Sequence, residues 1–183
     1  MDFSKDIITI ERDCDAILIP SGDPIKLISG THVRITQALG GDYTLFVNGN
    51  LVKISGKDAD AIGEKPPVIE QSSTKLNLGT PIAEEQIWEQ LRTVYDPEIP
   101  VNIVELGLVY DLNINTDDNG SSIKLKMTLT APGCGMGPVI AQDAESKIRA
   151  IAGVKNVLVE IVWEPLWNRD MMTDEAKLQL GMM

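Results

Sequence analysis

Short apolar runs alternate with turn residues in the first part of the chain, a pattern typical of short antiparallel strands. Asn48, Gly49 and Asn50 separate two such runs and favour a tight hairpin, because Asn and Gly tolerate positive φ. The expected strands are residues 6–11, 16–20, 24–28, 32–37, 43–47 and 51–55. No helix of useful length is expected among them. We therefore predict a small all-β, barrel-like domain over residues 1–61.

The second half of the chain changes to a helical period. Thr80 and Pro81 are typical of a helix start, with Thr as N-cap and Pro in the first helical position. Apolar residues at three- and four-residue spacing then place one helix face in the core: Ala83, Ile87, Leu91 and Val94. A second amphipathic helix is expected to bury Ile140, Ala144, Ile148 and Ile151 and to end at Gly153.

Strands are expected between and after these two helices. Residues 99–114 read as extended, residues 123–129 alternate apolar and polar side chains, and residues 154–162 read as a last strand. In the alternating strand, Lys124, Lys126 and Thr128 fall on the polar face. The order α-β-β-α-β predicts a compact domain, residues 79–183, with helices on one face of a small mixed sheet. The whole chain is thus expected to be of the α+β class.

Residues 62–78 are expected to be a linker, because paired prolines, a Ser-Ser-Thr run and mixed charges occur there without a helix or strand period. With 43% hydrophobic residues, the chain can form packed cores. Its formal net charge of −11 argues against nucleic-acid binding, which relies on Lys and Arg to neutralise phosphates. No stretch approaches the roughly 18 apolar residues of a membrane span, and the first residues do not resemble a secretory signal, so we expect a cytoplasmic protein with reduced thiols.

The residue types limit the available chemistry. The chain has one histidine, His32, and two cysteines, Cys14 and Cys134, so a closed zinc site of about four ligands cannot be built from Cys and His within one subunit. Cys14 lies between charged neighbours of both signs, whose effects on its pKa oppose one another, so a structural role and a reactive role both stay open. His32 fits an ordinary surface or satisfied histidine better than a ligand.

The most informative stretch is residues 130–138, where three glycines and two prolines surround Cys134. The stretch follows a predicted strand and opens a predicted helix, whose free N–H groups favour the thiolate that attacks electrophiles and binds metals. Low side-chain bulk argues against deep burial. The alternative is a tight turn in which Cys134 packs as a small apolar side chain.

Two further groups of residues are candidates. Asp96 and Glu98 flank Pro97 and could supply hard ligands or a base near the thiol, although Asp before Pro is also a common way to end a helix. Asn102 and Glu105 are weaker candidates in the same segment. Near the C-terminus, Trp163, Trp167 and Met171 stand out in an aromatic-poor chain; they either bind a partner or cover the sheet.

These segments resemble a known family. DPEIPVNIVELGLVYDLNI followed by KLKMTLTAPGCGMGP is similar to the PaaD-like domain of cytosolic iron–sulfur targeting factors, and VWEPLWNRDMMTDEAKLQLG continues the likeness. RDCDAILIPSGD, ITQALGGDYTLFV and GKDADAIG extend it over nearly the whole chain, to the SUF-associated iron–sulfur assembly factors. The chain departs from the wider family at Gly135, where Pro often follows the Cys, and in its additional β domain.

The resemblance implies an accessory, non-enzymatic role in iron–sulfur cluster assembly. Cys134 matches the reactive cysteine of the family, and Asp96, Pro97 and Glu98 match its DPE element. We expect Cys134, with Cys14 as a second candidate, to bind iron or a cluster transiently, with the other ligands supplied by a second copy in a homodimer or by the client. The expected partners are the SUF machinery and apo iron–sulfur proteins. Two alternatives stay open: an adaptor that recruits client apoproteins without binding metal, and a thiol enzyme that uses Cys134 with Asp96 or Glu98.

Overall fold

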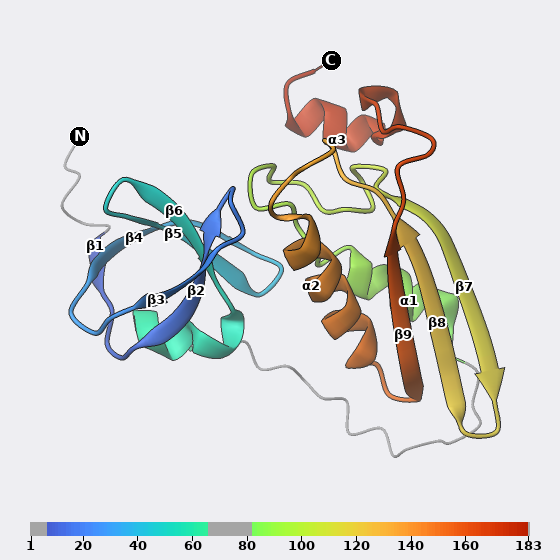
Figure 1. The fold of residues 1–183 in the computed structure, drawn as a ribbon, viewed down its shortest axis with the longest axis horizontal. Helices are drawn as coiled ribbons and strands as arrows, with labels where there is room; N and C mark the ends of the chain where they lie inside the picture. Colours follow the sequence, from blue (N-terminus) through green and yellow to red (C-terminus); the bar gives the residue numbers. More distant parts are fainter. Residues whose placement is uncertain (1–6, 66–81, 183) are drawn as a thin grey trace. The chain divides into compact units, whose positions relative to one another are not determined.

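The computed structural model describes residues 7–65 and 82–182 of the chain (Figure 1). Contacts divide the chain into two compact units, residues 1–69 and 70–183. The expected linker, residues 62–78, lies mainly outside the described residues, although Ile62 is buried in the core of the first unit. No helix within the described ranges is both long and apolar enough to cross a membrane.

The first unit is one antiparallel sheet of six strands in the order β1-β4-β5-β6-β2-β3. Its strands are β1 (Ile7–Thr9), β2 (Cys14–Ile19), β3 (Pro24–Leu27), β4 (His32–Leu39), β5 (Asp42–Val47) and β6 (Asn50–Ile54). The sheet curls on itself (Figure 1) and buries an apolar core. Strands β1 and β3 are not paired with one another in the described residues, so the expected barrel-like unit is an open sheet. The hairpin at Asn48 and Gly49 is confirmed, with φ of 49° and 85°.

A 3-10 helix, η1 (Gly56–Ile62), follows β6, although the sequence indicated no helix in this unit. Its buried Ala59, Ala61 and Ile62 are too few to make a helical period visible in the sequence. Arg12, in the turn before β2, holds η1 from outside the core: its guanidinium lies 2.9 Å from the Asp58 carboxylate and 2.6 Å from that of Asp60.

The Arg12 ion pairs predict a pH dependence of stability. The hydrogen bond from Arg12 lowers the pKa of Asp60 below its ordinary value of 3.8, so this contribution is present at neutral pH and is lost as the pH falls through the lowered pKa. We expect Arg12→Ala to reduce the free energy of unfolding at pH 7 and to speed hydrogen exchange in η1. At about pH 2 the difference between variant and wild type should shrink; a difference that is the same at both pH values would contradict this assignment.

The second unit is a three-stranded mixed sheet with two helices on one face (Figure 1). Its elements are α1 (Glu84–Leu91), β7 (Val109–Asp117), β8 (Gly120–Met127), α2 (Gly137–Arg149), β9 (Val154–Ile161), η2 (Arg169–Met171) and α3 (Asp174–Gln179). Strands β7 and β8 are antiparallel, and β8 and β9 are parallel and joined through α2. The predicted α-β-β-α-β order and the α+β class are therefore confirmed.

The core of this unit lies between the sheet and α1 and α2. Ile123, Leu125 and Met127 of β8 are at most 2% exposed, as their alternation predicted. The helices contribute the fully or almost fully buried side chains of Ile87, Leu91, Ile140, Ala144 and Ile148. The loops at the end of the sheet are thus anchored on a closely packed apolar core.

Four details of the second unit differ from the sequence expectations. Helix α1 has Ala83 as its N-cap, and Ala83 is exposed because Ile82 takes the buried position; the expected Thr80 and Pro81 start lies outside the described residues. Residues 99–108 form bends and turns with one isolated bridge, between Asn102 and Tyr95, and the extended strand begins at Val109. Ile151 is half-buried beyond the end of α2, and Thr128 is buried although it was expected on the polar face.

Candidate functional site

The loop that carries Cys134 connects β8 to α2 and is anchored at both ends. Leu129 and Met136 are 5% and 1% exposed, whereas Ala131, Pro132, Gly133 and Gly135 between them are exposed. Gly137 lies so close to Leu129 that a Cβ on it would overlap the leucine side chain. The loop therefore projects a short glycine-rich arc from a fixed base, and Cys134 lies in this arc.

Cys134 is half-buried and lies just before the first turn of α2. Its backbone N–H donates to the carbonyl of Ala131 over 3.4 Å, and its own carbonyl accepts from the N–H of Gly137 over 3.1 Å. Gly133 adopts φ +82°, and the space around its missing Cβ is empty. The thiol is thus held on a fixed backbone, with little side-chain bulk around it.

Three segments meet at the end of the sheet from which this loop leaves. Met127 at the end of β8 pairs with Val109 at the start of β7 and with Ile161 at the end of β9. Beyond the strands, Thr128 N–H donates to Leu108 and Val162 N–H donates to Met127, each over 2.8 Å. The loop before β7, the Cys134 loop and the segment after β9 therefore share one end of the second unit (Figure 1).

Asp96 and Asn102 shape the loop before β7. The carboxylate of Asp96, which is 4% exposed, accepts from the N–H of Glu98 over 2.8 Å. The side-chain oxygen of Asn102, 5% exposed, accepts from the N–H groups of Val104 and Glu105 over 3.1 and 3.0 Å. Both side chains hold turns, as Asx turns do, and Glu98 is exposed. A supporting role for Asp96 and Glu98 at a metal stays a prediction.

Cys14 belongs to the core of the first unit. It is 3% exposed, lies opposite Leu27 in the sheet and packs among apolar side chains. Burial raises the pKa of the Cys14 thiol, and the nearby Asp58 carboxylate raises it further. The protonated form is thereby favoured, which is the form that binds metals poorly. These surroundings fit the structural reading of Cys14.

The buried hydroxyl of Thr128 lies at the base of the Cys134 loop. Thr128 is 0% exposed, and its side-chain oxygen has no hydrogen-bond partner among the described residues. The sequence pattern did not indicate this feature.

The described residues contain no group of three His, Cys, Asp or Glu side chains arranged to hold a metal ion.

The C-terminal strap, defined here as residues 163–180, is hydrogen-bonded to the loop before β7 and to Tyr110 at the start of β7. Tyr110 Oη donates to the Pro165 carbonyl over 2.7 Å, and Trp167 Nε1 donates to the Leu106 carbonyl over 2.8 Å. Thr173 N–H donates to Glu105 over 2.9 Å, and Gln179 Nε2 donates to Pro100 over 2.8 Å. Thr173 also caps α3, because its side-chain oxygen accepts from the N–H of Ala176.

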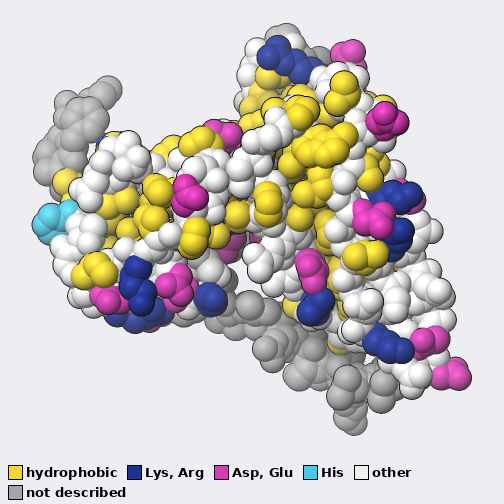
Figure 2. Space-filling view, viewed as in Figure 1, with side chains coloured by type: hydrophobic (Ala, Val, Ile, Leu, Met, Phe, Trp, Pro, Cys, Tyr) yellow, Lys and Arg dark blue, Asp and Glu magenta, His cyan; other side chains and the backbone are white. Residues whose placement is uncertain are grey.

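The three strap residues expected to bind a partner differ in their surroundings. Trp167 is held through its indole N–H, and Met171 Sδ accepts from Tyr110 Oη over 3.5 Å. Trp163 is 39% exposed, and the neighbouring Leu166 is 65% exposed. Apolar side chains reach the surface on this part of the second unit in Figure 2. Trp167 and Met171 thus fit the sheet-cover reading, whereas Trp163 exposes apolar surface, and partner binding by Trp163 stays a prediction.

Comparison with known proteins identifies the family to which the second unit is similar. The family model described as "Iron-sulfur cluster assembly protein" matches residues 84–160. A Porphyromonas gingivalis Fe-S protein maturation auxiliary factor is 47% identical over 98 residues, which are 54% of this chain and 90% of the relative. The Bacillus subtilis factor YitW is 42% identical over 53% of this chain and 92% of its own length, and the Staphylococcus aureus factor SufT is 44% identical over 48% and 97%.

Proposed function

Because this chain belongs to the iron–sulfur cluster assembly protein family, we propose that it is an accessory factor in iron–sulfur protein maturation whose Cys134 binds iron or a cluster in transit to client apoproteins. The observation that carries the proposal is the position of Cys134: half-buried, on a glycine-rich arc with a rigid base. The relatives are named auxiliary or maturation factors, which supports a non-enzymatic role.

The surroundings of Cys134 suit temporary binding better than permanent storage. Iron–sulfur clusters are held by Cys thiolates, usually four per cluster. Cys134 is the only thiol of the second unit, and the thiol of Cys14 is buried in the core of the first unit. We therefore assign the remaining ligands to the client, to the SUF machinery or to a second copy of the chain. A cargo held by so few ligands of its carrier is released readily to a client with a complete set.

Clients are proposed to dock on the strap, which begins at the end of the sheet from which the Cys134 loop also leaves. Trp163 and Leu166 expose apolar surface on a segment that four hydrogen bonds hold to the loop before β7 and to Tyr110 of β7. Aromatic side chains of this kind dominate the energetics of protein interfaces. The same surface supports the second candidate function, an adaptor that recruits apoproteins without binding metal itself.

Anaerobic reconstitution with ferrous iron and sulfide tests the ligand role. We expect the full chain to develop thiolate-to-iron charge-transfer absorption, and Cys134→Ser to lose most of it. Cys14→Ala is the matched control, because it removes the other thiol of the chain; it should retain the absorption of the wild type.

The adaptor function predicts another result in the same variants. If wild type and Cys134→Ser both stay colourless yet activate an apo client equally, ligation by Cys134 is wrong and the adaptor function is favoured. In that case Trp163→Ala, rather than Cys134→Ser, should reduce the amount of apo client retained by the immobilised protein.

A further inference from the structure

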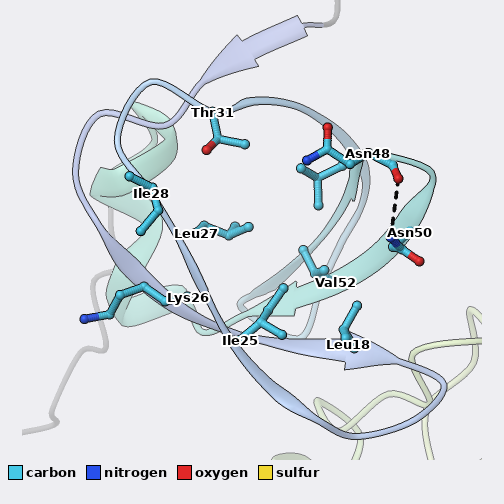
Figure 3. A pocket seen from close by; sticks show the side chains of 10 residues that line it. Leu18, Ile25, Lys26, Leu27, Ile28, Thr31, Asn48, Asn50 and Val52 are labelled. Atoms are coloured by element: carbon cyan, nitrogen blue, oxygen red, sulfur yellow. Dashed lines mark hydrogen bonds between the residues drawn. The ribbon is translucent and has the colours of Figure 1, made fainter.

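The methionines of the described residues all belong to the second unit, and their exposure differs widely. Met127, Met136 and Met172 are at most 5% exposed, whereas Met182 is 46% exposed near the C-terminus. Met171 lies between these limits and is half-buried in the strap. The hollow of about 270 Å³ in the first unit has no sulfur in its lining (Figure 3). Among the described residues, oxidation of methionine therefore reports on the second unit.

The sulfur atom of Met171 lies against a hydroxyl that holds the strap. Tyr110 Oη lies 3.5 Å from Met171 Sδ and 2.7 Å from the carbonyl oxygen of Pro165. A tyrosine hydroxyl has one proton to donate, and a thioether sulfur is a weak acceptor. Pro165 therefore keeps the stronger hydrogen bond for as long as Met171 is a thioether.

The backbone at Met171 is fixed on the side away from its sulfur. A Cβ on Gly107 would lie 2.2 Å from the Met171 carbonyl oxygen, so the two backbones are in close contact. Met172, the next residue, is 5% exposed, and the N–H of Thr173 donates to the carbonyl of Glu105 over 2.9 Å. A group added to the Met171 sulfur therefore acts on the contact between Tyr110 and the strap rather than on residues 171–173.

We propose that Met171 is an oxidation switch: hydrogen peroxide converts its thioether to the sulfoxide, and the sulfoxide releases residues 163–167 of the strap from Tyr110. In this step a lone pair of the thioether sulfur attacks one peroxide oxygen, the O–O bond breaks, and the other oxygen leaves as water. The thioether is oxidised and the peroxide is reduced. Because Tyr110 has one proton, it then donates to the polar sulfoxide oxygen, and the Pro165 carbonyl loses its donor.

Release is expected to spread along the strap to Trp167 and to stop before α3. Residues 163–170 have no buried side chain, and the hydrogen bonds Tyr110–Pro165 and Trp167–Leu106 hold this segment to the body of the second unit. By contrast, Met172 is buried, and so is Ala176 in α3. A segment with few buried contacts opens locally at low cost.

The released segment carries Trp163 and Leu166, which expose apolar surface. Oxidation of Met171 would therefore alter the surface on which clients are proposed to dock, and this consequence rests on the proposed function. The release itself does not depend on that function. Methionine sulfoxide reductases reverse the modification, so the change is switchable in both directions.

Hydrogen exchange of the full chain before and after treatment with hydrogen peroxide tests the proposal. Every protein in the experiment carries Cys134→Ser, so that peroxide does not act on the half-buried thiol. Peptide mass spectrometry should show one oxygen added to Met171 and to the exposed Met182 while the buried Met172 is still unmodified. The indole N–H of Trp167 should then exchange at least about tenfold faster, with exchange in β8 unchanged.

Two substitutions of methionine separate the switch from general oxidation. Met171→Leu keeps an apolar side chain of similar size without the sulfur, so peroxide should leave its exchange unchanged. Met182→Leu is the matched control, because it removes an exposed methionine that does not contact Tyr110, and it should retain the full response. Reduction by methionine sulfoxide reductases should restore slow exchange at Trp167.

Tyr110→Phe tests the hydrogen bond that the sulfoxide is proposed to capture. This variant lacks the donor to Pro165, so the Trp167 indole N–H should exchange fast before any treatment and should change little after it.

Three results would overturn the proposal: oxidation of Met171 no faster than that of Met172, unchanged exchange at Trp167 once Met171 is oxidised, or the same response to peroxide in Met171→Leu. Because no arm of the experiment involves iron, sulfide, a client or the thiol of Cys134, its failure leaves the function proposed for the second unit unaffected.

Discussion

Cys134→Ser is expected to lower cluster transfer from an assembly scaffold to an apo client to the rate measured without the protein. A serine hydroxyl is isosteric with the thiol but ionises far less readily and binds iron weakly, so the variant loses the ligand and keeps the loop. The fold should be unaffected, because Cys134 is half-buried on an exposed arc and its side chain is no part of the core. The measurement is the recovery of client activity over time, with scaffold and client in excess.

Cys14→Ala serves as the control for this experiment. It removes a core thiol and should lower the free energy of unfolding, but transfer should continue at the rate of the wild type for as long as the protein is folded. Equal transfer by wild type and Cys134→Ser, with unchanged unfolding curves, would contradict the ligand role and favour the adaptor.

Gly107→Ala is expected to cause the largest loss of stability among substitutions in the site. Gly107 has φ +70°, where a residue other than glycine costs about 1–2 kcal/mol. A Cβ there would also overlap the carbonyl oxygen and carbon of Met171 in the strap, and a backbone group cannot move aside as a side chain can. We expect the free energy of unfolding in urea to fall by about 3 kcal/mol or more, with fast hydrogen exchange of the Trp167 indole N–H.

Gly133→Ala separates the two causes of this loss. Gly133 has φ +82°, but nothing lies within 4 Å of its added Cβ, so this variant pays only the conformational cost of about 1–2 kcal/mol. If Gly107→Ala loses no more stability than Gly133→Ala, the backbone at Met171 moves away from the added methyl group at little cost. That result would contradict a strap held tightly against Gly107.

The local pattern of apolar and polar residues predicted secondary structure and burial correctly where these depend on neighbours in the sequence. Ile87, Leu91 and Val94 were placed correctly on the buried side of the segment around α1, and Ile123, Leu125 and Met127 on the buried face of β8. The turn at Asn48 and Gly49 followed from the positive φ that these residues tolerate. These patterns are sufficient to predict the α+β class and the order of elements in the second unit.

Features that depend on distant residues could not be predicted in this way. Helix η1 is held by ion pairs from Arg12, and Trp167 is held by the carbonyl of Leu106; no local pattern contains either contact. Asn102 turns the segment that reads as extended, because its side chain accepts from two backbone N–H groups that follow it. For Cys14, alternation with the buried Ala16 was the available signal of burial, whereas the glycines around Cys134 did indicate a loop with little side-chain cover.

Protection of Cys134 from alkylation by bound iron tests the central claim most directly. Iodoacetamide should label Cys134 in the folded apoprotein and leave the buried Cys14 unlabelled until the protein is unfolded. After anaerobic loading with iron and sulfide, labelling of Cys134 should slow sharply, and it should recover once an apo client has removed the cargo. Labelling of Cys134 at the same rate in the loaded and the unloaded protein would contradict the proposal that this thiol binds the cargo.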